Sequence, residues 1–219
     1  SGCIPMNKPN CKSGTVRVVG GHEVKPPNKY PFIVSLQQTG ILNQDHFCGG
    51  VVLDELTILT AAHCVDFGYR PFVLVGRHDL NKPPEKDAGP IRKDVFRVSK
   101  SISHPNWNRQ TYENDLAILK LDAPISPSPK ARMSVPLARW PTSKTERWFD
   151  NAYAHAPPGT RFMMVGWGTL EWQGSPSEVL QEAEVCVKPL AMCNARWSYN
   201  GKVLPGMFCA GGEGADSCQ

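Results

Sequence analysis

Two polar residues stand next to apolar runs where they could perform acid–base chemistry. His63 lies near the end of "LTAAHC", just before Cys64, and Asp115 precedes the apolar run of "YENDLAILKL". Taken singly, such a His is more often a structural residue, and such an Asp can merely cap or turn the chain. Together they describe an imidazole base and the carboxylate that holds its tautomer, each fixed at the edge of a rigid strand. The pair is therefore a candidate catalytic base with its orienting acid.

Short strand-like runs must position these two residues. They are "PFIVSLQ", "FCGGVVLDELTILTAA", "PFVLVG", "DLAILKL" and "RFMMVGWG", separated by turn-forming stretches such as "KPPNKYP" and "APPGT". A spacing of about ten residues favours a sandwich or a barrel over alternating helices and strands. The long polar segment 138–160 is interpreted as a connection between two halves. Residues 1–17 show no periodicity and are interpreted as an appended tail.

The composition excludes several classes of function. The net charge is +4 without a long basic run, which argues against nucleic-acid binding. No apolar stretch approaches the roughly 20 residues that span a bilayer, so a membrane is not an expected partner. The chain begins Ser-Gly-Cys, so we expect any signal peptide to have been removed already.

Eight cysteines fit either zinc ligands or disulfides. They occupy positions 3, 11, 48, 64, 186, 193, 209 and 218, with none of the Cys-x2-4-Cys pairs that zinc sites usually show. Wide spacing in a turn-rich chain favours disulfides and an oxidising compartment. We therefore expect a secreted, extracellular protein with no metal and no cofactor.

Six motifs in one order resemble the chymotrypsin–trypsin family of serine endopeptidases. They are "RVVGG", "HFCGG" with "LTAAHC", "NDLAILKL", "GWG", "MFCAG" and "DSCQ", and they run from residue 17 to residue 219. The resemblance implies an all-β fold of two antiparallel six-stranded barrels, the second incomplete in this chain. The implied division is a tail at 1–17, a first barrel at 18–137, a connection at 138–160 and a second barrel at 161–219. It also implies that His63 is the general base and that Asp115 orients it.

The resemblance assigns further roles near the end of the chain. Asp216 falls at the floor of the primary specificity pocket, with Ser217 and Gln219 in the same substrate-binding segment. A carboxylate in a desolvated pocket is costly unless it meets a cation, so the implied substrate residue is Lys or Arg. In the family the nucleophilic Ser and the oxyanion hole follow directly after this motif, so we expect the chain to be inactive alone.

The resemblance also implies a set of disulfides. Cys48 should pair with Cys64, and Cys193 with Cys209. Cys3 and Cys11 are expected to pair with each other, since the stretch "ARMSVPLAR" offers no thiol to the tail. We expect Cys218, and Cys186 with it, to await a partner in a following segment.

Two positions depart from the family pattern. Phe162 stands where many members have a Cys. Arg77 stands where a calcium-binding member would have an acid, which argues against calcium, although Asp79, Glu85 and Asp87 leave the question open.

The implied activation site is the bond between Arg17 and Val18 in "TVRVVGG". In the family the freed amine pairs with the Asp beside the nucleophile, and this buried ion pair orders the pocket. The bond is intact in this sequence, which predicts a zymogen. Inactive precursors in the family often hold that Asp against a His and a Ser, and His46 and Ser35 match those positions.

The leading prediction is a secreted, trypsin-like zymogen that hydrolyses peptide bonds after Lys or Arg in a regulated cascade. Its expected partners are protein substrates, an activating protease and protein inhibitors. The alternative is a non-catalytic protease homologue that acts as a regulatory or binding partner. The retention of His63, Asp115 and Asp216 favours the enzyme, because a pure binding protein has no need of all three.

Overall fold

The computed structural model describes residues 21–27, 29–38, 46–82, 94–125, 152–169 and 175–211. These residues form ten strands with three short helical segments. The strands are β1 (His22–Glu23), β2 (Ile33–Gln37), β3 (His46–Asp54), β4 (Thr57–Thr60), β5 (Phe72–Val75), β6 (Val95–Ser103), β7 (Ala117–Leu121), β8 (Arg161–Gly166), β9 (Gln181–Val187) and β10 (Ala210–Gly211). The helical segments are the 3-10 helix η1 (Ala62–Gly68), α1 (Ala152–His155) and α2 (Leu190–Cys193). None of the helices in the described residues is long and apolar enough to cross a membrane.

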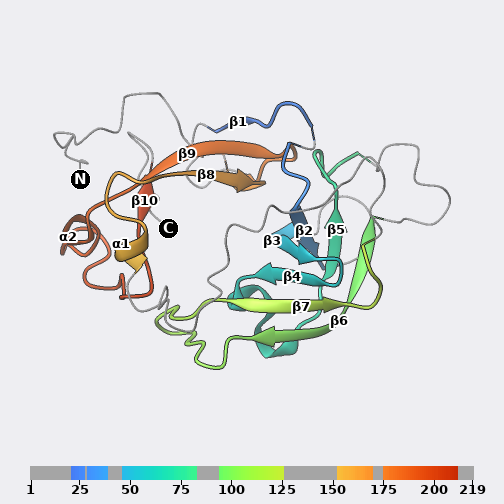
Figure 1. The fold of residues 1–219 in the computed structure, drawn as a ribbon, viewed down its shortest axis with the longest axis horizontal. Helices are drawn as coiled ribbons and strands as arrows, with labels where there is room; N and C mark the ends of the chain where they lie inside the picture. The colour runs from blue at the N-terminus through green and yellow to red at the C-terminus, as the bar shows by residue number, and fades with distance from the viewer. Residues whose placement is uncertain are drawn as a thin grey trace.

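Six strands close into an antiparallel barrel in the order β2-β3-β4-β7-β6-β5. In β6 buried Phe96 and Val98 flank exposed Arg97, the alternation expected of a strand with one buried face. The barrel interior is filled by apolar side chains, among them Val34, Leu36, Ile58, Val73 and Leu119. Closure leaves this sheet without an open edge (Figure 1).

The glycines of "HFCGG" have a packing role in this barrel. A Cβ atom at Gly50 would lie 2.9 Å from Ile58 Cγ2 and 3.0 Å from Val34 Cγ2. These contacts are too short for a real Cβ, so any larger residue would push apart three neighbouring strands. Gly50 therefore permits close packing between β2, β3 and β4.

The other sheet has four strands in the described residues and is not closed. β9 lies at its centre, paired with β1, β8 and β10. The long antiparallel pairing of β8 with β9 runs from Arg161 opposite Cys186 to Gly166 opposite Gln181. Figure 1 shows these two strands as an arch above the closed barrel. The prediction was an all-β fold of two six-stranded barrels with the second incomplete. The described residues agree with it, because they form one closed six-stranded barrel and a second sheet that is not closed.

β1 belongs to the second sheet although it precedes the first barrel in the chain. His22 lies opposite Glu182, and Glu23 lies opposite Gln181. The start of the expected 18–137 unit is therefore paired with the other half of the molecule. The expected connection, 138–160, contains α1 where it is described.

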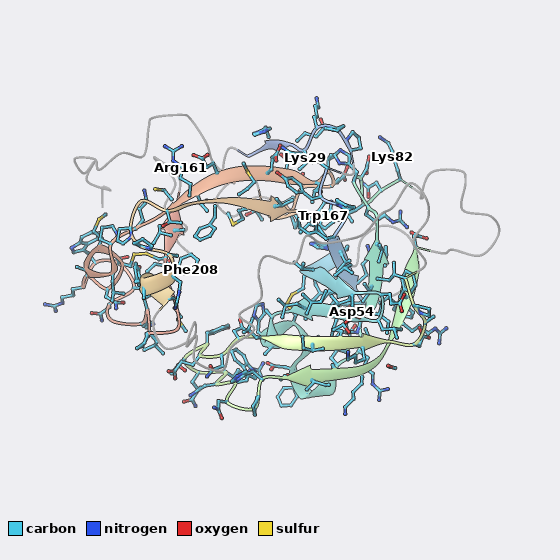
Figure 2. All side chains as sticks on the ribbon, viewed as in Figure 1. Lys29, Asp54, Lys82, Arg161, Trp167 and Phe208 are labelled. Carbon is cyan, nitrogen blue, oxygen red and sulfur yellow. A yellow bond between two sulfur atoms is a disulfide. The ribbon has the colours of Figure 1, made fainter. Side chains whose placement is uncertain are left out.

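A second apolar cluster joins the two halves. It is formed by Val24, Leu80, Trp167 and Leu180, all nearly or fully buried. Trp167 Nε1 donates to the His78 carbonyl at 3.1 Å, and Leu180 N donates to the same carbonyl at 2.8 Å. Figure 2 shows Trp167 near the end of β8, toward the barrel strands. These contacts hold β8 and β9 against the loop that follows β5.

Candidate active site

The strand pairing of the first barrel brings His63 and Asp115 together. β4 pairs antiparallel with β7, and Thr60 lies opposite Ala117 at the end of this pairing. His63 follows β4 by three residues, and Asp115 precedes β7 by two. The two side chains therefore leave neighbouring strands at the same edge of the barrel, as their motifs predict.

Asp115 holds His63 at two points. Its Oδ2 atom lies 2.6 Å from His63 Nδ1, and its Oδ1 atom accepts a 2.9 Å hydrogen bond from the His63 backbone N–H. The His63 side chain is 46% exposed and that of Asp115 is 22% exposed, so the imidazole faces solvent while the carboxylate lies behind it. A carboxylate on Nδ1 favours the tautomer that carries its proton there. The lone pair on Nε2 is then the basic one, and this geometry suits a general base.

A disulfide fixes the backbone next to His63. Cys64 is bonded to Cys48 of β3, as the resemblance implies. Within the described part of the chain, Cys48, His63 and Cys64 are the one group whose atoms could be read as a metal site. Because the two sulfur atoms are bonded to each other in the disulfide, neither is a thiolate that could bind an ion. We therefore interpret the group as a brace for the His63 backbone.

His46 and Ser35 also contact each other, across the pairing of β2 with β3. Ser35 Oγ lies 2.8 Å from His46 Nδ1. Burial lowers the pKa of His46 below its ordinary value, which favours the neutral imidazole near neutral pH. The ring also meets Trp167 edge-on, with centroids 5.5 Å apart. The contact between the two predicted zymogen residues is thus present, and their role stays a prediction.

The cysteines follow the expectation in two pairs and depart from it at one position. Cys193 is bonded to Cys209, which spans the loop after α2. The expectation that Cys186 awaits a partner in a following segment is wrong, because Cys186 is disulfide-bonded within this chain. The other four described cysteines pair among themselves. The expectations for Cys3, Cys11 and Cys218 fall outside the described residues.

Several predicted site residues lie outside the described residues. They are the pocket residues Asp216, Ser217 and Gln219 and the cleavage-site residues Arg17 and Val18. The two positions that depart from the family pattern are both described. Phe162 is stacked on Phe208, with ring centroids 5.4 Å apart. The Arg77 guanidinium is buried and donates to Asp94 and, at 2.6 Å, to the Lys82 carbonyl.

Two residues near His63 were not singled out from the sequence. Asp66 lies in η1, and its Oδ1 atom accepts a 2.9 Å hydrogen bond from Trp107 Nε1. Tyr112 meets the rings of both Trp107 and His63 edge-on. A single Asp or Tyr in a loop carries no motif, and the available signal was its closeness in sequence to His63 or Asp115.

Comparison with known proteins agrees with this geometry. The family model described as Trypsin matches residues 18–219. Granzyme M of Rattus norvegicus is 34% identical over 206 residues, which cover 93% of this chain and 70% of the relative. Granzyme M of Homo sapiens is 33% identical over 202 residues, with 91% and 68% covered. The chain belongs to the trypsin family of serine proteases.

Proposed function

We propose that this chain is the main part of a secreted, trypsin-like serine endopeptidase that is made as a zymogen. In this proposal the reaction is acyl transfer followed by hydrolysis. His63 takes the proton of a nucleophilic Ser, and Asp115 keeps the imidazole in the required tautomer. The family supplies that Ser in the motif that follows "DSCQ".

The observation that carries the proposal is the pair of contacts that the Asp115 carboxylate makes with His63. One carboxylate oxygen fixes the ring through Nδ1, and the other fixes the His63 backbone. An Asp that only capped a turn would bind backbone groups of its own loop. A carboxylate that binds both the ring and the backbone of a His far away in the sequence restrains that ring, which is what a general base requires.

The substrate preference rests on Asp216. The family resemblance assigns Asp216 to the floor of the specificity pocket. A carboxylate there would select a cationic side chain, so the proposed cleavage follows Lys or Arg. The relatives named Granzyme M agree with protein substrates without deciding this preference.

The proposal that proteolytic cleavage activates the protein is based on the sequence around Arg17 and Val18. We propose that an activating protease cuts this bond, and that protein inhibitors act on the product. In the uncut form His46 and Ser35, which contact each other, would hold the Asp beside the nucleophile. Two described disulfides and the bonded Cys186 support an oxidising, extracellular setting.

The test uses the full-length protein, including the segment that carries the nucleophile. It is treated with trypsin, its new N-terminus is sequenced, and its amidase activity is measured on Arg, Lys and Phe substrates. An Arg17→Gln variant treated in parallel reports any activity left over from trypsin itself. We expect a Val18 N-terminus and cleavage of the Arg and Lys substrates by the processed protein alone.

Each other outcome contradicts a separate part of the proposal. Full activity with the Arg17–Val18 bond intact rejects the zymogen. Equal rates on Phe and Arg substrates reject the role of Asp216. A correctly processed protein without activity supports the non-catalytic homologue.

A further inference from the structure

We infer that Asp66 is a positioning residue for the pair of His63 and Asp115. It is held against Trp107, which packs on Tyr112, and Tyr112 packs on the His63 ring. The inference rests on the proposed function, because it assigns His63 the role of a base. It adds a residue from outside the motifs through which the chain resembles its family.

Asp66 ties together the two loops that carry the site. It lies in η1, three residues after His63, and it accepts from Trp107 Nε1 at 2.9 Å and from Arg109 Nε at 3.2 Å. Trp107 and Arg109 both precede Asp115 in the loop between β6 and β7. One carboxylate, 18% exposed, thus links the loop after His63 to the loop before Asp115.

Trp107 gives this link a fixed anchor. Its ring packs against the apolar core of the closed barrel. A hydrogen bond from a core-packed indole restrains its acceptor far better than one from a mobile surface group. The Arg109 side chain, in contrast, is 64% exposed, and an exposed ion pair of this kind contributes little to stability. The bond to Trp107 is therefore the one that we expect to position Asp66.

The contacts continue from Trp107 to His63. Tyr112 meets the Trp107 ring edge-on at 5.7 Å between centroids, and the His63 ring edge-on at 6.0 Å. Asp115 restrains His63 in the plane of its ring through Nδ1. Tyr112 restrains the same ring by packing. A displaced Trp107 would release Tyr112 and leave the imidazole held by the carboxylate alone.

The backbone around these residues shows that the loops need such a restraint. Three of the four described non-glycine residues with positive φ lie here: Phe67 at 58°, Tyr112 at 57° and Asn114 at 57°. Non-glycine residues are strained in this left-handed region, and such conformations persist where surrounding contacts fix them. Phe67 directly follows Asp66 and is 93% exposed, and the Arg109 guanidinium lies over its ring, with Cζ 5.2 Å from the centroid. The bond between Trp107 and the neighbouring Asp66 ties this position to the core of the barrel.

The test uses three variants that separate the two partners of Asp66. Asp66→Ala removes both bonds, whereas Asp66→Asn keeps an oxygen that accepts from Trp107 and loses the charge facing Arg109. Trp107→Phe keeps an aromatic ring but removes the N–H donor together with part of the indole, and it also serves if Asp66→Ala fails to fold. Asp54→Ala is the matched control. Asp54 accepts a 2.8 Å bond in the turn between β3 and β4, at the opposite end of β4 from His63.

The first readout is the NMR signal of the His63 Nδ1 proton, which needs no turnover. We expect Asp66→Ala and Trp107→Phe to broaden this signal through faster exchange, and Asp66→Asn and Asp54→Ala to leave it unchanged. The second readout is kinetics of the activated full-length enzyme. Asp66→Ala and Trp107→Phe should each lower kcat about tenfold and change KM by less than about twofold, because a misplaced base affects the chemical step.

Two outcomes overturn the inference. An unchanged Nδ1 proton signal in Asp66→Ala shows that Asp115 alone positions His63. Equal damage by Asp66→Asn and Asp66→Ala shows that the charge toward Arg109 acts, and not the bond to Trp107. If the activated enzyme has no activity at all, the proposed function fails, and the NMR signal still decides the role of Asp66.

Discussion

Replacing Glu182 by Gln should destabilise the protein strongly, because a buried carboxylate there holds three donors. The Glu182 side chain is 3% exposed, at the centre of the second sheet. Both of its oxygens accept from Lys29 Nζ at 2.8 Å, and it also accepts from the Tyr30 hydroxyl. His22 Nε2 lies 3.3 Å away. These donors come from the segment that leads from β1 into the first barrel, so Glu182 fastens that segment to β9.

The magnitude follows from the partners. A hydrogen bond to a charged group contributes about 1.5–3 kcal/mol, and Gln loses the charge for both Lys29 and Tyr30. The Gln amide would also present its own N–H groups to a cluster of donors. The Lys29 side chain is 39% exposed, so its ammonium group can form hydrogen bonds to water in the variant, and this limits the loss of stability. We expect a destabilisation of about 3 kcal/mol, equivalent to about 6–12 °C in Tm for a chain of this size.

The effect should depend on pH. Burial raises the pKa of Glu182, but the hydrogen bonds from Lys29 and Tyr30 outweigh it, and the pKa lies below its ordinary value of 4.5. The stabilisation is therefore present above pH 4.5 and is lost as the pH falls through the lowered pKa. The Tm difference between the wild type and Glu182→Gln should be full at pH 7 and should shrink in acid below about pH 4.

The control is Glu184→Gln, two residues further along the same strand. Glu184 pairs with Arg161 at 2.6 Å, but both side chains are more than 40% exposed. Such surface pairs contribute little, so Tm should fall by less than about 2 °C. Thermal unfolding followed by circular dichroism at pH 7 and pH 3.5 measures both variants. Equal Tm losses in the two variants, or a loss for Glu182→Gln that does not change with pH, would refute the reasoning.

Three further predictions concern the site and the cross-links. Asp115→Asn in the activated full-length enzyme should lower kcat by about 10⁴-fold through the wrong His63 tautomer, and a loss below tenfold would contradict the assignment. Peptide mapping without reduction should find Cys186 joined to Cys218. Cys186 lies opposite Gly211, and the loop from Cys186 to Cys218 is shorter than a loop to Cys3 or Cys11 and closes at a lower entropic cost. A peptide that joins Cys186 to Cys3 or Cys11 would contradict both this prediction and the Cys3–Cys11 pair. Calcium and a chelator should leave Tm unchanged in the wild type, because the Arg77 guanidinium already binds Asp94 and the Lys82 carbonyl; a rise in Tm with calcium would contradict this.

The sequence predicted those strands whose residues follow simple apolar patterns. β2, β5 and β7 are short apolar runs bounded by turns, and they lie where the pattern places them. β9 was missed because it begins with two buried polar residues, Gln181 and Glu182. Their burial depends on partners from distant segments, which no local pattern reveals. β1 was missed for a related reason, since two residues form a strand only when β9 is beside them.

The sequence could predict those contacts of the site that follow from the pairing of neighbouring strands. His63 and Asp115 belong to motifs that flank paired strands, so their meeting follows from the register of β4 with β7. The bond between Asp66 and Trp107 joins loops whose conformations include positive φ at Phe67 and Tyr112. Such conformations are fixed by tertiary contacts rather than by residue preference. The same applies to the cross-link of Cys186, whose spacing from the other cysteines gave no indication.

The pairing of β1 with β9 has a consequence for the order in which the chain can fold. The six strands of the closed barrel all lie between these two partners in the sequence, so the barrel can close while β9 has not yet been synthesised. β1 has no partner strand until the ribosome has made nearly the whole described chain, and contacts so far apart in sequence form late. We expect the segment around β1 to stay accessible to chaperones and proteases in the nascent protein until β9 has formed. Its pairing with β9 would then join the start of the described chain to the second sheet after the first barrel has closed.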